Sequence, residues 1–167
     1  MSGSRLTHAE CRHLLSDAAF GRVVLLRDDR IVVELAELID ICAAPVMLVP
    51  PGTSLAELCA EACAAGTALT LQTERIDRAA GSVRSVALTG VPAWIVARAT
   101  LRACAVAAAE RHGMRTGLRF MVLCEPSMHG HVYPLHTYPP RERGPAGGRD
   151  LAGEAVPPRP PGSRRPP

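Results

Sequence analysis

The residues most able to do chemistry in this chain are six cysteines, six histidines and a few serines. No two cysteines have the Cys-x-x-Cys spacing of a structural zinc site. Cys59 and Cys63 would share one helix face, and His129 and His131 alternate, but structural metal sites pair their ligands more tightly. We therefore expect no metal site, and we expect reduced cysteines that pack as small apolar side chains.

Nucleophilic catalysis has little support in the sequence. Ser54, Ser82 and Ser85 have no histidine beside them in any nucleophile motif, so there is no hydrolase signature. All 19 basic residues are arginine. The lack of lysine excludes a Schiff base to pyridoxal phosphate, a P-loop lysine and a lysine general base. The catalytic residues stay unassigned at this point.

The length and charge of the chain narrow its class. A length of 167 residues indicates one domain, and a hydrophobic content of 47% with only 3% aromatics predicts an aliphatic core. The net charge of +3 comes from the segment after Pro139, because the body before it carries equal numbers of acids and arginines. A neutral body argues against a nucleic-acid partner. With no leader and no apolar run of spanning length, we expect a cytoplasmic protein with no membrane contact.

Hydrophobic periodicity and turn signals predict mainly short strands. A capping box at Thr7 and Glu10 opens a helix over 6–18, and a second one at Ser54 and Glu57 opens another. An alanine-rich helix ends near Gly113. Strands are expected at 21–27, 30–38, 45–49, 69–76, 84–96 and 118–124, with a last short one near 131–135, and helices at 6–18, 54–64 and 100–112. Short strands joined by tight turns such as Asp28-Asp29 favour an antiparallel barrel with peripheral helices.

The chain divides near residue 138. Residues 139–167 contain nine prolines and almost nothing to bury, so we predict a disordered Pro/Arg-rich tail after a domain over 1–138. The tail is either passive or a polyproline ligand for another domain.

Three motifs in order resemble the flavin-binding split barrels related to pyridoxamine 5′-phosphate oxidase. The first is LTHAECRHLL at 6–15 followed by Gly21-Arg22-Val23, which is similar to the opening helix and Gly-Arg-Val of small bacterial members. The second is Ile76-Asp77, a loop, and VRSVALTG at 83–90. The third is FMVLCEP at 120–126 with Gly130 after it. Together they cover residues 6–135.

The resemblance implies a mainly β fold, a six-stranded antiparallel Greek-key split barrel with peripheral helices. It also implies a homodimer with FMN in a groove at the dimer interface. The phosphate-binding segment of the family is similar to residues 47–54 here, where Gly52 and Thr53 remain. The family's arginine, lysine and tryptophan are replaced by Leu48, Ser54 and Arg84.

Two features compensate in part for the lost cations. Gly52, Thr53 and Ser54 open a helix, whose free amides attract an anion, although Ser54 also reads as a plain N-cap. Arg84 either reaches inward toward the cofactor or lies in solvent. Gln72 and Glu74 alternate on one strand and share a face, which either contacts a flavin edge or ribityl chain or is an ordinary exposed strand face. Gln72 and Ser85 are expected among the cofactor-binding residues. Trp94 either stacks on the flavin ring or packs in the core or the dimer seam.

Two functions follow from these expectations. The first is an FMN-dependent oxidoreductase of unknown substrate, in which the cofactor carries the chemistry. The second is a degenerate split-barrel homodimer that acts as a scaffold or ligand sensor, or that binds another cofactor such as a deazaflavin or haem.

Overall fold

The structure, a computed structural model, describes residues 4–135. The predicted boundary at residue 138 and the predicted tail lie outside the described residues. The described part contains three helices and seven strands: α1 (His8–Asp17), α2 (Ser54–Ala65), α3 (Arg98–His112), β1 (Ser4–Arg5), β2 (Phe20–Arg27), β3 (Arg30–Ile41), β4 (Ala44–Val49), β5 (Leu69–Asp77), β6 (Ser82–Trp94) and β7 (Arg119–Pro134).

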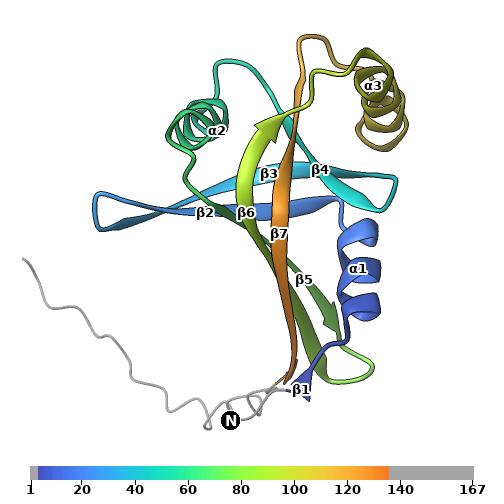
Figure 1. Ribbon diagram of the computed structural model, residues 1–167. Coiled ribbons are helices and arrows are strands. Elements are labelled where there is room, and N and C mark those ends of the chain that lie inside the picture. Colours follow the sequence, from blue (N-terminus) through green and yellow to red (C-terminus); the bar gives the residue numbers. More distant parts are fainter. Residues whose placement is uncertain (1–3, 136–167) are drawn as a thin grey trace, which may run out of the picture. The chain divides into compact units, whose positions relative to one another are not determined.

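The strand pairings confirm the predicted six-stranded antiparallel split barrel. The order β7-β4-β3-β2-β5-β6 closes through a further β6–β7 pairing, and two-residue β1 adds to the free edge of β7. The ladders β2–β5 and β4–β7 each hold only three residue pairs, whereas β6 and β7 pair over nearly their whole length. The helices lie outside the strands, with α2 and α3 near one end of the long β6–β7 ribbon and α1 beside its middle (Figure 1).

The prediction of two separate strands at 118–124 and 131–135 is wrong, because β7 runs unbroken from Arg119 to Pro134. The sequence between them looks like a turn, but Glu125 has a φ of +42° and the partner strand shifts register between Thr89 and Val91. These features bend the ribbon without ending it. Pro92 lies just beyond this bulge, where β5 no longer pairs with β6, and a proline is tolerated at such a position because no ladder hydrogen bond to β5 is needed.

Two separate apolar cores stabilise the barrel. The interior core is aliphatic, as expected, and it contains residues of all six barrel strands together with Cys11 and Leu15 of α1 and Leu58 and Cys59 of α2. A second core lies on the outer face of β3, β4 and β7, where α3 contributes Cys104 and Ala108. Full burial of one aliphatic side chain stabilises the fold by about 1.5–3 kcal/mol, so the α3 core is a substantial part of the structure.

The N-cap of α2 is Thr53, and the predicted capping box at Ser54 is therefore wrong. The Thr53 hydroxyl accepts a hydrogen bond from the amide of Ala56 at 3.2 Å and donates one to the carbonyl of Pro50 at 2.8 Å. Ser54 is the first helical residue. The capping box of α1 is confirmed, as are the turn at Asp28-Asp29 and the cap of α3 at Gly113.

Candidate functional site

A cluster of polar side chains crosses three strands on the outer face of the barrel. The side-chain amide of Gln72 on β5 donates to the hydroxyl of Ser85 on β6 at 3.3 Å and to the carboxylate of Glu74 at 3.2 Å. The guanidinium of Arg22 on β2 donates to the other oxygen of Glu74 at 3.0 Å. We call Arg22, Gln72, Glu74 and Ser85 the outer-face cluster.

The alternation of β5 places this cluster outside the barrel. Leu69, Leu71 and Thr73 point inward and are buried, so Gln72 and Glu74 point outward. Sequence analysis placed Gln72 and Glu74 on one face, and the structure confirms it. It missed Arg22, which belongs to the cluster because β2 pairs with β5 through Arg22 and Gln72. That register joins segments fifty residues apart, and no local pattern reports it.

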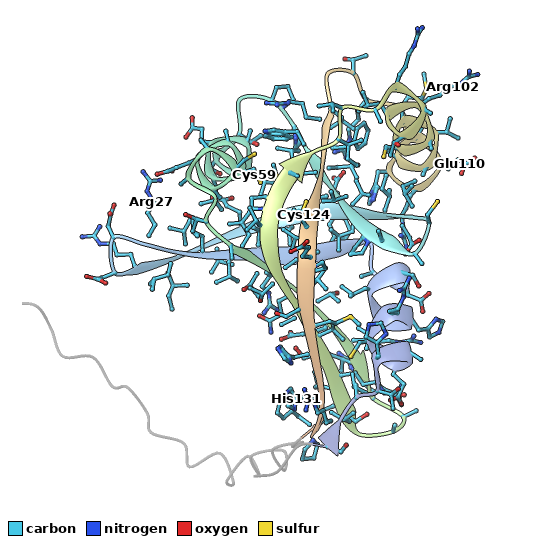
Figure 2. All side chains as sticks on the ribbon, in the orientation of Figure 1. Arg27, Cys59, Arg102, Glu110, Cys124 and His131 are labelled. Atoms are coloured by element: carbon cyan, nitrogen blue, oxygen red, sulfur yellow. The ribbon has the colours of Figure 1, made fainter. Side chains whose placement is uncertain are left out.

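Two histidines extend the outer face beyond the cluster. His131 pairs with Ser85 and His129 pairs with Ala87, so both imidazoles share the face of the cluster. Figure 2 shows His131 near the end of β7 that carries β1. Arg5 of β1 lies 3.5 Å from Nδ1 of His129. This part of the face therefore provides imidazole and guanidinium donors.

Exposed aliphatic side chains border the cluster on its other side. Leu26, Ile31, Val33 and Leu35 alternate along the β2–β3 hairpin with exposed fractions of 66%, 73%, 52% and 65%. Leu35 pairs with Arg22, so this apolar surface adjoins the outer-face cluster directly. We call these four residues the β2–β3 face. Contiguous exposed apolar surface of this kind marks interaction sites.

The N-terminus of α2 follows strand β4, three strands from Gln72. Because the ring closes through β6 and β7, β4 and β5 are three strands apart in either direction and lie on opposite sides of the barrel. Gly52 has a φ of +71° and opens the turn before Thr53. Ser54 is exposed and its side chain is free of the cap, so Gly52, Thr53 and Ser54 present backbone amides and one hydroxyl.

Leu48, which stands where the family has its phosphate-binding arginine, is buried and inaccessible to a ligand. Leu48 is only 1% exposed and belongs to the second core beneath α3, together with Cys104 and Ala108. No side chain from this position reaches an outer ligand. In place of that arginine the described residues offer a phosphate the amides of α2, and the polar side chains of the outer-face cluster lie three strands away.

Arg84 and Trp94 lie away from the outer-face cluster. Arg84 lies on the same side of β6 as Val86 and Leu88, opposite to Ser85, but its side chain is exposed, so of the two alternatives it lies in solvent. Trp94 packs against the interior core, and the guanidinium of Arg119 lies 3.6 Å from the centre of its ring. Trp94 therefore has the packing role among the two that the sequence left open, and Arg84 does not join Gln72 and Ser85.

The cysteines show no sign of shared chemistry. All six are free, and burial raises the pKa of Cys59 to about 11 and also raises the pKa of Cys11 and Cys104. Within residues 4–135, no three His, Cys, Asp or Glu side chains gather as metal ligands would. In the same part of the chain, no helix has the length and apolarity to cross a membrane.

Comparison with known proteins identifies the fold. No protein-family model matches the chain, and no curated protein matches it. Solved structures do match. The FAD-binding protein of Mycobacterium smegmatis has a TM-score of 0.61 at 18% identity, with 78% of this chain and 99% of that one covered. A candidate pyridoxamine 5′-phosphate oxidase of Corynebacterium glutamicum has a TM-score of 0.58 at 14% identity, with 80% and 100% covered.

A third similar structure is that of a haem storage protein. The haem storage protein HutZ of Vibrio cholerae has a TM-score of 0.55 at 10% identity, and the match covers 74% of this chain and 94% of that one. At these identities the likeness shows a common fold. The chain therefore has the split-barrel fold that flavin-binding and haem-storing proteins share.

Proposed function

We propose that the protein is an FMN-binding split-barrel oxidoreductase of the pyridoxamine 5′-phosphate oxidase type, active as a homodimer on a small-molecule substrate in the cytoplasm. The observation that carries the proposal is the outer-face cluster, in which Gln72, Ser85 and Arg22 present polar groups from three strands of a split barrel. The likeness to FAD-binding and oxidase-type split barrels supports it.

The chain would hold the flavin through its own donors and acceptors. Gln72 and Ser85 would face the ring edge or ribityl chain, and the amides of Ser54 and Leu55 at the start of α2 would receive the phosphate. The amide of Glu57 already donates to the Thr53 carbonyl and that of Ala56 to the Thr53 hydroxyl, so the first two amides of the helix would be the ones available to the phosphate. A bound flavin supplies hydride or electron transfer.

The burial of Leu48 supports a second candidate function, in which the protein binds no flavin. An Arg–phosphate pair is charge-assisted and contributes about 1.5–3 kcal/mol, which this chain forgoes at that position. A split-barrel homodimer without flavin, acting as a scaffold or ligand sensor, is therefore the alternative. Binding of a deazaflavin or haem belongs to the same alternative, and the similar haem storage protein lends weight to haem.

The near-ultraviolet and visible absorption of the full chain separates these functions. The protein is purified, and its spectrum is recorded before and after addition of excess FMN followed by desalting. A flavin band that survives desalting is the expected result. A colourless protein would contradict FMN binding. A haem Soret band after the same treatment with haemin would instead support the alternative.

A charge placed at the start of α2 tests where the phosphate lies. Ser54→Lys restores the cation that the family carries there, so we expect FMN to bind about tenfold more tightly or better. Ala60→Lys is the matched control, since Ala60 is exposed on the same helix but away from its N-terminus. Fluorescence quenching of FMN on titration gives both dissociation constants. Equal constants for Ser54→Lys and the unchanged chain would rule out this placement.

A further inference from the structure

A cavity of about 260 Å³ lies beside α1, and it shares no residue with the outer-face cluster. Its floor is formed by Leu15 of α1, Leu88 of β6 and Leu123 of β7, all of which are buried. Pro126 and Met128 of β7 form a second side. The cavity is slightly smaller than typical small-molecule pockets and has the usual apolar lining, so it suits one compact ligand.

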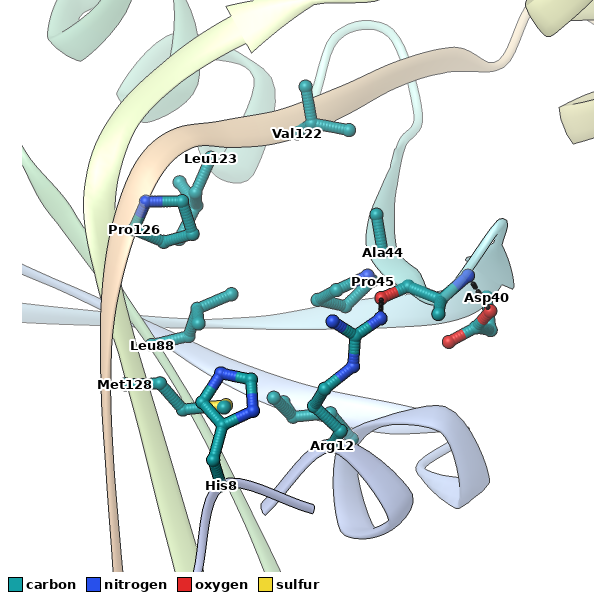
Figure 3. Close-up of a pocket in the computed structure, with 12 residues that line it drawn as sticks. His8, Arg12, Asp40, Ala44, Pro45, Leu88, Val122, Leu123, Pro126 and Met128 are labelled. Carbon is teal, nitrogen blue, oxygen red and sulfur yellow. Dashed lines mark hydrogen bonds between the residues drawn. The ribbon is translucent and has the colours of Figure 1, made fainter.

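Two nitrogen-bearing side chains project from α1 at the mouth of this cavity. His8 and Arg12 are four residues apart and therefore share one face of the helix. Figure 3 shows His8 beside Met128, and it shows the Arg12 guanidinium between the helix and Pro45. One terminal nitrogen of Arg12 donates to the carbonyl of Ala43 at 2.8 Å, and the other is turned toward the open space.

The wall opposite α1 holds Arg12 in place. It is the β3–β4 turn, in which Cys42 and Ala43 both have left-handed φ angles of +52° and +62°. The amide of Ala43 donates to the carboxylate of Asp40 at 2.9 Å, which fixes the turn. The carbonyl of Ala43 then faces Arg12. The guanidinium is thus positioned before any ligand arrives, which lowers the entropy cost of binding.

The positive charge of Arg12 at the cavity mouth indicates that the ligand is an anion. Among residues 4–135, no carboxylate lies within ion-pair distance of Arg12, whereas other arginines such as Arg22 and Arg115 are paired. Asp40 is the only acid on the cavity wall, and it is directed at the turn amide. An apolar chamber with an unpaired guanidinium at its mouth matches an apolar body that ends in an anion. We propose that this cavity binds small apolar monocarboxylates, with Arg12 as the carboxylate ligand and His8 as a second donor.

Methyl NMR of the full chain with phenylpropionate as the probe tests the site. We expect a dissociation constant of about a millimolar or tighter. We also expect shifts of the Leu88, Val122, Leu123 and Met128 methyl signals. Phenylpropionamide, which has the same shape without the charge, should bind at least about tenfold more weakly. Equal affinity for the acid and the amide, or shifts confined to other methyl groups, would overturn the proposal.

Four variants test whether binding depends on the charges at the cavity mouth or on the free volume of the cavity. Arg12→Gln should weaken phenylpropionate about ten- to hundredfold, because it removes a charge-assisted pair. Asp40→Asn keeps an acceptor for the turn amide but removes a negative charge, and it should tighten binding severalfold. Ala44→Phe should fill the cavity and prevent binding.

Arg102→Gln is the matched control, because Arg102 projects from α3 away from the barrel (Figure 2). Its affinity should equal that of the unchanged chain. If Arg12→Gln and Arg102→Gln bind phenylpropionate equally well, Arg12 is not the carboxylate ligand and the proposal fails. If Arg12→Gln does not fold, tighter binding by Asp40→Asn still supports the site, and weaker binding by that variant contradicts it.

Discussion

Two neighbouring residues at the start of α2 each carry a hydroxyl, but only one of the two hydroxyls caps the helix. Thr53 bridges the Pro50 carbonyl and the Ala56 amide, whereas the Ser54 hydroxyl makes no cap. Loss of an N-cap side chain costs about 1 kcal/mol. Thr53→Ala should therefore lower the free energy of unfolding by about that amount, and Ser54→Ala should change it by less than about 0.5 kcal/mol. Urea denaturation of both variants measures these free energies. A larger loss of stability in Ser54→Ala than in Thr53→Ala would show that Ser54 is the N-cap.

The buried thiol of Cys59 makes stability depend on alkaline pH. Burial raises its pKa from 9.0 to about 11, so the folded chain holds a proton that the unfolded chain releases between these values. Stability from this thiol is fully present below pH 9 and is lost as the pH rises through about 11. The free energy of unfolding should fall by up to about 1.4 kcal/mol per pH unit in that window.

Denaturation of the Cys59→Ala chain at several alkaline pH values isolates this effect. The variant should be less stable at neutral pH, since it leaves a small cavity, but its stability should decline less steeply above pH 9. Cys42→Ala is the control, because Cys42 is exposed and free. Parallel slopes for the Cys59→Ala chain and the unchanged chain would show that another group titrates.

At the scale of elements, local signals predicted most of the helices and strands. Capping by Thr7, the turn at Asp28-Asp29 and the cap at Gly113 depend on residues within a few positions of one another, and these predictions were confirmed. The N-cap of α2 was misplaced by one residue because threonine and serine stand side by side there. Local chemistry could not separate them, whereas the hydrogen bond to Pro50 does.

Predictions that depend on strand pairing or packing were weaker. Arg22 joins the outer-face cluster only through the β2–β5 register. Leu48 is buried only because α3 packs over β4. Arg84 was a candidate for the cofactor because it replaces the family's tryptophan, but it lies on the opposite side of β6 from Ser85. The cavity beside α1 unites a helix, a turn and two strands, which no sequence interval brings together.

The docking of α1 against β7 depends on Gly130. A methyl group at this position would meet the sulfur of Cys11 and lie 2.9 Å from Cδ1 of Leu6, both of which are buried. Gly130→Ala should therefore shift α1 and destabilise the fold by about 1–3 kcal/mol. The double variant Gly130→Ala with Cys11→Ala should recover part of the loss. Thermal unfolding measures both, and a Gly130→Ala chain as stable as the original would contradict this packing role.

At the scale of the whole molecule, we expect a second copy of the chain to dock on the β2–β3 face. Its four aliphatic residues stand exposed on one hairpin and adjoin the outer-face cluster, so a dimer formed there would enclose the cluster at its edge. Two-fold symmetric dimers bring the same patch of each subunit together, which an apolar strand pair allows. The proposed homodimer and the proposed flavin groove therefore depend on the same surface.

Light scattering during size-exclusion chromatography, together with FMN titration, tests whether dimerisation and flavin binding both depend on the β2–β3 face. The unchanged chain should elute with twice the mass of the 17.7 kDa monomer. The double variant Val33→Glu with Leu35→Glu should elute as a monomer, because four carboxylates would be brought together in the dimer. Val106→Glu on α3, which is 53% exposed, is the control and should remain dimeric. If the double variant stays dimeric, the interface lies elsewhere. If it is monomeric but binds FMN unchanged, the outer-face cluster needs no second subunit, and the flavin groove would belong to one barrel alone.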